Sequence, residues 1–372
     1  MSPILHSSVK IGRHQLAHRV VMAPLTRMRA SEPGATPSAL NAHYYGQRAS
    51  QSGLIISEAS QISWQGKGYP RTPGIHSDEQ IAGWKAVVDA VHAKGGVIFM
   101  QLWHTGRISH SSHRNDRSLP VSASAVAPAG QAFGAAFERL PYEKPRSLET
   151  DEIPGIVADY KRAARNALAA GFDGVELHGA NGYLIDRFLQ DRTNRRTDRY
   201  GGPIENRVRL LLEATEGLID VCGADRVGVR LSPFGAVGDM ADADPASLFD
   251  HAIEALSARQ IAYLHLIEPR ANAGIRDGLN HEAPASVTAL YRKLFNGPLI
   301  ASGGFTKQSA EAELKTGNAD PIAFGRAFIA NPDLPHRFAI GAPLNTPEAG
   351  TFYGGGERGY TDYPALVAEG VA

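Results

Sequence analysis

The sequence predicts an α/β fold, because short apolar stretches alternate with helix-length amphipathic stretches along nearly all of its 372 residues. Eight of the short stretches have the length and composition of buried strands, and eight strand–helix units close naturally into a (β/α)8 TIM barrel. No linker-like stretch divides the chain, so we expect one domain over residues 1–372. The predicted strands are 19–23, 53–57, 97–102, 174–178, 226–231, 262–267, 299–302 and 322–325.

Helix ends between these strands carry signals of their own. Polar N-cap residues begin helices, proline fits their first position, and glycine ends them. Both halves of the strand–helix repeat therefore have local support. The signals are a capping box at 77–80 with Gly95-Gly96 behind it, a start at 150–152 with an end at Gly171, Thr306 with Gly317, and Asn331-Pro332 at the start of the last helix.

Two additions account for the length beyond the ~250 residues that such a barrel needs. Residues 9–15 look like a hairpin ahead of the first strand, which we expect to plug the lower end of the barrel. Residues 106–147 are rich in Ser, Pro, Gly and Ala and lack helical periodicity. Because this long insertion follows the third strand, we expect it to overhang the active-site mouth.

Composition excludes several classes of function. Lys plus Arg equals Asp plus Glu at 38 each, so no net field would recruit nucleic acid or an anionic membrane. The single cysteine, Cys222, lies in a helical pattern, where we expect it to pack. No apolar run approaches the ~20 residues of a membrane span. We therefore expect a soluble cytoplasmic protein, a monomer or homodimer, that acts on small molecules.

The stretch from Val175 to Tyr183 carries the densest polar chemistry. It reads as a strand that delivers His178, Asn181 and Tyr183 beyond its carboxyl end. Two fixed donors that converge on one oxygen, with a phenol nearby, would polarise a carbonyl or nitro group and protonate the product. Considered alone, a His-x-x-Asn pair after a strand more often stabilises a loop than takes part in catalysis.

Residues after the seventh and eighth predicted strands occupy the usual phosphate site of a TIM barrel. Gly303 and Gly304 would let backbone N–H groups approach a phosphate, and Arg326 after Gly325 would add a charged contact. The alternative is that the paired glycines only form tight turns. Arg230 falls at the end of the fifth strand, where a salt bridge inside the barrel is the alternative to a ligand contact.

Motifs spread from end to end resemble the Old Yellow Enzyme family of FMN-dependent ene-reductases. The resemblance covers nearly the whole chain and is specific in several separate segments. The motifs are MAPLTR at 22–27, QLWHTGR at 101–107, GFDGVELHGANGY at 171–183, YGGPIENR at 200–207, FGR at 324–326 and GYTDYP at 359–364.

The resemblance implies non-covalent FMN, reduced by NADPH or NADH, across the barrel mouth. It implies that the phosphate lies at Gly303, Gly304, Gly325 and Arg326. The isoalloxazine would be held by Pro24, Thr26, Ala59, Gln101 and Arg230.

The same resemblance implies a ping-pong reaction on α,β-unsaturated carbonyls, maleimides and nitroalkenes. His178 and Asn181 would bind the oxygen of the activated alkene, and flavin N5 would give hydride to the β-carbon. Tyr183 would then protonate the α-carbon. The family has His or Asn at the position of Asn181, so finer substrate preference is left open. Tyr69, Trp103 and Tyr353 resemble the aromatic walls of the pocket.

Other functions fit the sequence less well or remain open. Reduction of nitrate esters or nitro compounds as the main activity, or a catalytically silent flavin-binding protein, are alternatives within the same fold. A Schiff-base lyase or aldolase would need a lysine at a strand end, and none of the eight predicted ends has one. His104, His110 and His113 lack an organised carboxylate partner, so we expect no metal. The G-x-G-x-x-G pattern at 354–359 follows no predicted strand and precedes no helix, so we do not expect a dinucleotide-binding site there.

Overall fold

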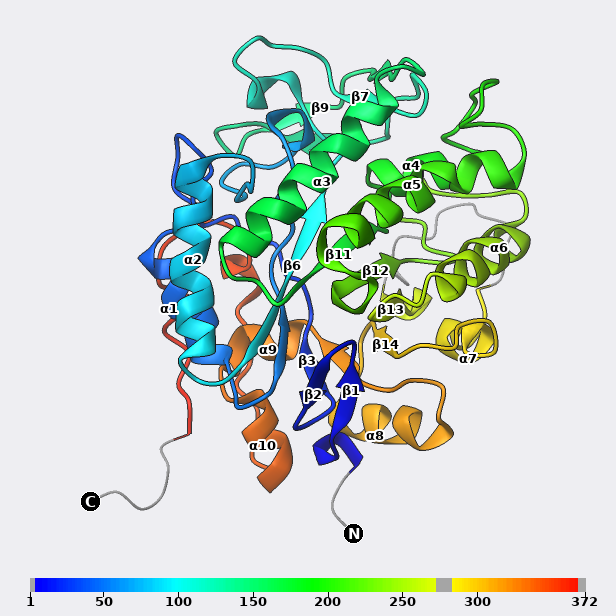
Figure 1. Ribbon diagram of the computed structural model, residues 1–372. Coiled ribbons are helices and arrows are strands. Elements are labelled where there is room, and N and C mark those ends of the chain that lie inside the picture. Colours follow the sequence, from blue (N-terminus) through cyan, green and yellow to red (C-terminus); the bar gives the residue numbers. More distant parts are fainter. Residues whose placement is uncertain (1–3, 272–282, 367–372) are drawn as a thin grey trace.

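A closed barrel of eight parallel strands forms the centre of the computed structural model, which describes residues 4–271 and 283–366. The strands neighbour one another in chain order, and the pairing of β15 with β3 closes the ring (Figure 1). Their bounds are β3 Val20–Met22, β4 Leu54–Ile56, β6 Val97–Trp103, β11 Gly174–Gly179, β12 Val227–Leu231, β13 Tyr263–Ile267, β14 Leu299–Ser302 and β15 Ile322–Phe324. The predicted (β/α)8 barrel is confirmed, with every strand within two residues of its expected bounds.

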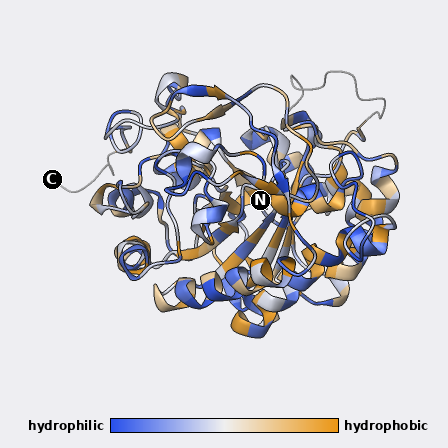
Figure 2. Ribbon diagram, turned by 90° about the horizontal axis from the view of Figure 1, so that it is seen from above, coloured by the Kyte–Doolittle hydropathy of each residue, from blue (hydrophilic) through white to orange (hydrophobic). Residues whose placement is uncertain are grey.

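Helices surround the strands, and their ribbons alternate between hydrophobic and hydrophilic residues (Figure 2). This alternation is expected for helices that bury one face against a barrel. Their bounds are α1 Ala39–Arg48, α2 Asp78–His92, α3 Ile153–Ala169, α4 Leu184–Leu189, α5 Ile204–Cys222, α6 Pro245–Ala258, α7 Val287–Tyr291, α8 Lys307–Thr316, α9 Arg326–Ala330 and α10 Leu334–Ile340. Cys222 is buried at the end of α5, as expected of a packing residue. In the described part of the chain, no helix combines the length and apolar character needed to cross a bilayer.

Three predicted helix starts were right and one was early. Ser77 caps α2 through a capping box, and Thr306 caps α8. Helix α3 begins at Ile153 with Glu152 as its N-cap, within the predicted start at 150–152. Helix α10 begins at Leu334, and Asp333 rather than Asn331 is its N-cap. The reason is that Asn331 is the C-cap of α9, since its backbone and side-chain N–H groups both donate to the Ala327 carbonyl.

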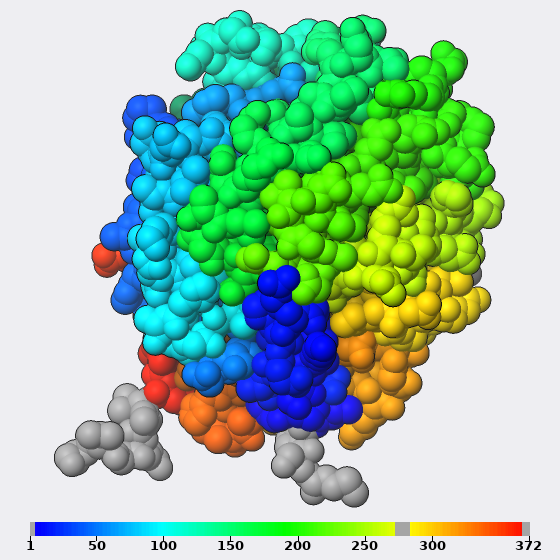
Figure 3. All heavy atoms as spheres, in the orientation of Figure 1, coloured from blue at the N-terminus to red at the C-terminus, as the bar shows by residue number. Residues whose placement is uncertain are grey.

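The N-terminal hairpin plugs the barrel, as predicted. Strands β1 Val9–Ile11 and β2 His14–Leu16 pair in antiparallel fashion. Val9, Ile11 and Leu16 pack in one apolar cluster with residues from the barrel interior, including Phe99 and Tyr263. Figures 1 and 3 show the hairpin in dark blue on the lower part of the molecule, away from β7 and β9. The lower barrel interior is therefore closed and apolar.

The long insertion folds into small elements over the opposite end. It contains a 3₁₀ turn, Ser111–His113, and four short strands. The strands β7 Val121–Ser122 and β10 Arg146–Ser147 pair in parallel, and β8 Gln131–Phe133 pairs with β9 Arg139–Pro141 as an antiparallel hairpin. Phe133 and Arg139 from this hairpin line a cavity beside Tyr69 and Tyr183, which confirms the predicted overhang.

Three buried arginines fasten the C-terminal segment to the barrel. Arg27 donates to the carbonyls of Phe352 and Gly359, at 2.9 and 2.7 Å. Arg29 donates to the carbonyls of Thr351 and Gly356, each at 2.9 Å. The third, Arg48 of α1, donates to Tyr360 O at 3.1 Å, and the rings of Tyr44 and Tyr360 stack with centroids 3.9 Å apart. We call these arginines, with residues 351–360, the C-terminal clamp.

Candidate active site

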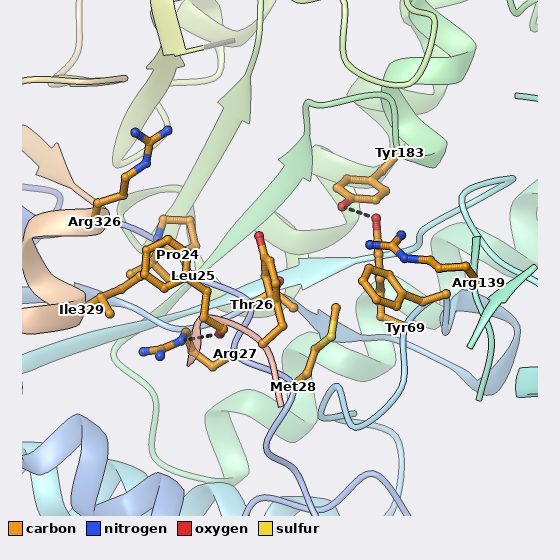
Figure 4. A pocket seen from close by; sticks show the side chains of 13 residues that line it. Pro24, Leu25, Thr26, Arg27, Met28, Tyr69, Arg139, Tyr183, Arg326 and Ile329 are labelled. Atoms are coloured by element: carbon orange, nitrogen blue, oxygen red, sulfur yellow. Dashed lines mark hydrogen bonds between the residues drawn. The ribbon is translucent and has the colours of Figure 1, made fainter. Parts of the chain in front are cut away.

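Two adjoining cavities open at the carboxyl ends of the strands. The first has a volume of about 530 Å³ and the second about 340 Å³, and Pro24, Leu25 and Arg326 line both. Figure 4 shows the first cavity, with Arg326 and Pro24 on one side and Tyr183, Tyr69 and Arg139 on the other. The first cavity is lined by Pro24, Leu25, Thr26, Arg27, Met28, Tyr69, Phe133, Arg139, Tyr183, Arg326, Ile329, Phe352 and Tyr353.

The turn after β11 delivers the residues singled out from the sequence. β11 continues to Gly179, so His178 lies within the strand rather than beyond it. Asn181 and Gly182 both have positive φ, 55° and 73°, and they reverse the chain sharply. Asparagine and glycine are the residues that tolerate this left-handed conformation best. The backbone N–H of Asn181 donates to Ser232 Oγ at 2.8 Å, and Tyr183 becomes the N-cap of α4.

Four aromatic rings pack around this turn. The His178 and Tyr183 ring centroids are 4.9 Å apart and nearly perpendicular. Trp103 lies 4.8 Å from the Tyr183 ring and stacks on His178 at 6.1 Å and on Tyr69 at 5.7 Å. The hydroxyls of Tyr69 and Tyr183 are hydrogen-bonded at 3.1 Å. His178, Tyr183, Tyr69 and Trp103 therefore form one cluster, brought together from β11 and the turn after it, from β6, and from the loop between β4 and α2.

Protonation states follow from these surroundings. Burial, together with the charge of Arg230, lowers the pKa of His178 well below its usual value, so the ring is neutral at physiological pH. The backbone N–H of Ala180 donates to His178 Nδ1 at 3.3 Å, which assigns the proton to Nε2. Burial raises the pKa of Tyr183 to about 12, despite the opposing hydrogen bond from Tyr69. Both side chains are thus neutral donors.

Arg230 and Gln101 lie on β12 and β6, the two strands that flank β11. Arg230 is 9% exposed and lines the second cavity, and its Nε makes no hydrogen bond to any described residue. Gln101 is 1% exposed, and its Nε2 donates to Glu176 Oε1 at 2.7 Å. The salt bridge considered as an alternative role for Arg230 is absent among the described residues, so its guanidinium is available to a ligand.

The far end of the second cavity contains the predicted phosphate residues. Gly303, Gly304, Gly325 and Arg326 all line it, together with Asn181 and Arg230. Gly303 and Gly304 have φ of 114° and 72°, and a Cβ on Gly304 would meet no atom within 4 Å. The backbone at Gly304 is therefore open to a ligand that approaches closely. Arg326 is exposed at the start of α9.

Several cavity residues were missed by the sequence analysis. Phe133 and Arg139 come from the insertion, and Phe352 comes from the C-terminal clamp. Arg270 lines the second cavity after β13, with its guanidinium 4.2 Å from the Phe305 ring centroid. The signal for Arg270 was its position after the sixth strand, the one strand end that supplied no predicted site residue. Of the predicted residues, Pro24, Thr26, Tyr69 and Tyr353 line the first cavity, whereas Ala59, Gln101, Trp103 and His178 line neither.

Comparisons with known proteins agree with this geometry. The model of the NADH:flavin oxidoreductase / NADH oxidase family matches residues 5–345. The chain belongs to this family. Among solved Old Yellow Enzyme family structures, morphinone reductase is 48% identical with a TM-score of 0.92, over 98% of this chain and 97% of that one. The Old Yellow Enzyme homologue from Zymomonas mobilis is 44% identical, with a TM-score of 0.92, over 98% and 100%. Among curated relatives, 12-oxophytodienoate reductase 1 from Oryza sativa subsp. japonica is 45% identical over 96% of this chain and 92% of that protein.

Membership establishes the chemistry class. The protein is an FMN-dependent NAD(P)H oxidoreductase of the Old Yellow Enzyme family, an ene-reductase for activated alkenes. The residues present fit the cofactor, because the buried Arg230, whose Nε has no partner within residues 4–271 and 283–366, lines a cavity that also contains Pro24 and the open backbone at Gly304. A cofactor with a phosphate tail matches the positive charge of the second cavity, which is lined by Arg230, Arg270 and Arg326.

Proposed function

We propose that His178, Asn181 and Tyr183 carry the reaction on the alkene, and that Pro24, Thr26, Ala59, Gln101 and Arg230 hold the flavin ring of FMN. Gly303, Gly304, Gly325 and Arg326 hold its phosphate. When bound, FMN takes hydride from NAD(P)H and passes it to the β-carbon of the alkene. Tyr69, Trp103 and Tyr353 form or support the walls of the substrate pocket. The observation that carries the proposal is the neutral His178–Tyr183 pair beside two adjoining, arginine-lined cavities.

His178 and Asn181 bind the carbonyl or nitro oxygen of the substrate. A neutral imidazole with its proton on Nε2 stabilises the negative charge that develops on this oxygen without transferring a proton to it. The left-handed backbone at Asn181, fixed by Ser232 Oγ, holds the second donor in one place. Polarisation by both donors makes the β-carbon electrophilic.

Tyr183 supplies the proton to the α-carbon. Since burial raises its pKa to about 12, it retains the proton until carbanion character develops in the substrate. The Tyr69 hydroxyl, 3.1 Å away, can donate a hydrogen bond to the Tyr183 oxygen once that oxygen has given up its proton. The pair therefore works as a proton donor with its own stabilising partner.

Tyr183→Phe tests this assignment. The variant keeps the ring and its packing but removes the proton. Flavin reduction by nicotinamide should change little, while oxidation by an enone should slow by about 10²–10⁴-fold, the usual contribution of a general acid. Stopped-flow absorbance of the two half-reactions separates these steps. Enone reoxidation as fast as wild type would show that another group donates the proton.

A nitroalkene substrate provides the matched control. Its product anion is stable enough to leave and be protonated by water, so the same variant should reduce it with a smaller loss. Equal losses with the enone and the nitroalkene would instead indicate damage to oxygen binding at His178 and Asn181.

We also infer that the protein works in the cytoplasm as a monomer or homodimer, without nucleic-acid or membrane partners, and that residues 1–372 form one folding unit. The balanced charge, 38 basic against 38 acidic residues, supports the exclusion of nucleic acid. Packing of the hairpin inside the barrel and of the C-terminal clamp on α1 supports one unit. Light scattering after size exclusion measures the oligomeric state.

A further inference from the structure

Four buried polar side chains form a layer inside the barrel, between the apolar plug and the active site. Gln101 and Glu176 are register partners on β6 and β11, and Arg230 and His265 are register partners on β12 and β13. Exposure is 1% for Gln101, 9% for Arg230 and zero for Glu176 and His265. Burying such groups costs desolvation free energy unless they are hydrogen-bonded or paired with an opposite charge, so we asked which partners each of them has.

Glu176 connects the layer through both of its carboxylate oxygens. Oε1 accepts from Gln101 Nε2 at 2.7 Å, and Oε2 accepts from His265 Nδ1 at 2.9 Å. A carboxylate can only accept, so Nδ1 of His265 carries the proton. Burial lowers the pKa of His265 and keeps this ring neutral. Glu176 is therefore held as an anion by two neutral donors.

The contact with Glu176 also fixes which end of the Gln101 amide is free. Because Nε2 is committed to the carboxylate, the unpaired end is Oε1, and it makes no hydrogen bond to any described residue. Gln101 thus offers an acceptor. The pyrimidine edge of a flavin carries one N–H donor between two carbonyls, so an acceptor at this place selects that N–H.

The charge of Glu176 acts on Arg230 without direct pairing. No ion pair joins the Arg230 guanidinium to another described residue. Burial lowers the pKa of Arg230, and Glu176 is the strongest influence that opposes this shift. Burial would raise the pKa of Glu176, but His265, Arg230 and Gln101 outweigh it and lower the pKa. The layer therefore contains one positive and one negative charge, with the positive group left free for a ligand.

We propose that Glu176 is a positioning residue for FMN: it turns Gln101 into a fixed acceptor and places a compensating negative charge beside Arg230. This inference rests on the proposed placement of the flavin ring at Gln101 and Arg230. Arg230 stabilises the negative charge that a flavin gains at N1 and O2 on reduction, and Glu176 opposes that effect. Glu176 therefore limits how strongly the site favours the reduced cofactor, which keeps hydride release to the alkene favourable.

Glu176→Gln tests the charge. Its amide oxygen can still accept from Gln101 while the negative charge is lost. We expect the ratio of affinities for reduced over oxidised FMN to rise at least tenfold, a positive shift of about 30 mV in the two-electron midpoint. Glu58→Gln, at another buried carboxylate, is the matched control and should shift the midpoint less. An unchanged midpoint in Glu176→Gln, or an equal shift in Glu58→Gln, overturns the proposal.

Glu176→Asp tests the positioning of Gln101. The shorter side chain keeps the charge but cannot reach both Gln101 and His265, so FMN binding to apoprotein should weaken while the midpoint moves less than in Glu176→Gln. Quenching of FMN fluorescence measures this affinity. A purely structural role predicts lower stability in both variants with a wild-type midpoint. Failure of the proposed flavin placement looks different, because Arg230→Ala would then leave both FMN binding and the midpoint at their wild-type values.

Discussion

Glu58 offers a prediction that links a buried charge to stability. It lies after β4 and is fully buried, and its oxygens make only long contacts, 3.3 Å from Arg27 N and 3.4 Å from the Tyr45 hydroxyl. Burial raises its pKa from 4.5 to about 7, although Arg27, Tyr45 and Arg29 favour the anion. The folded protein therefore holds a proton on Glu58 more tightly than the unfolded chain does.

The sign and size of the effect follow by linkage. Because the folded pKa exceeds the unfolded value, the stabilising contribution is fully present below about pH 4.5 and is lost as pH rises through about 7. A separation of about 2.5 pH units, at about 1.4 kcal/mol per unit, corresponds to about 3 kcal/mol. Glu58→Gln removes the ionisable group. As pH rises from about 5 to about 8, the free energy of unfolding of the variant should therefore increase by about 2–3 kcal/mol relative to that of wild type.

Urea unfolding of FMN-loaded protein, with FMN in fixed excess, measures this difference at several pH values. The substitution also changes the free energy of unfolding by an amount that does not depend on pH. Only the pH dependence of the difference between variant and wild type therefore tests the prediction. Glu149→Gln, at an exposed glutamate, should show no such change. A difference between Glu58→Gln and wild type that is the same at about pH 5 and pH 8 would refute the reasoning.

Three further changes have defined outcomes. Tyr69→Phe removes the hydroxyl 3.1 Å from Tyr183, and should slow enone reoxidation about fivefold, for one hydrogen bond of about 1 kcal/mol, without changing flavin reduction. Arg326→Ala should weaken FMN binding but leave riboflavin binding unchanged, as titration of apoprotein with each flavin would show. Gly12→Ala places a Cβ 2.0 Å from Asp225 O, so its melting temperature should fall well below that of Gly341→Ala, which shares a positive φ but meets no atom within 4 Å.

The barrel was predictable because its signals are local. Strand β14 begins and ends at the predicted residues, and the capping boxes at Ser77 and Thr306 are present. Long-range features were not readable in the same way. Phe133 and Arg139 reach the first cavity only because the insertion folds back over the barrel mouth. The start of α10 was misplaced because the Asn331 side chain bonds back to α9, a choice that spacing alone does not reveal.

The candidate site was predictable only where a motif fixes the residue. His178, Asn181 and Tyr183 lie together on one strand–turn–helix connection, and their motif is contiguous in sequence. The partners that set their chemistry come from distant segments, such as Tyr69 for Tyr183. The sequence also indicated a buried polar contact at Glu176 that was not predicted, because a charged residue between two apolar ones in a buried strand must have partners.

The C-terminal clamp affects how the site is completed as the chain leaves the ribosome. Arg27 and Arg29 emerge more than 300 residues before the carbonyls that they bind at 351–360. Until those last residues are synthesised, the guanidinium groups must remain hydrated, and the cavity wall that contains Phe352 and Tyr353 does not exist. Nascent chains should therefore lack a finished flavin cavity, and capture of the cofactor becomes an event that follows translation rather than one that guides it.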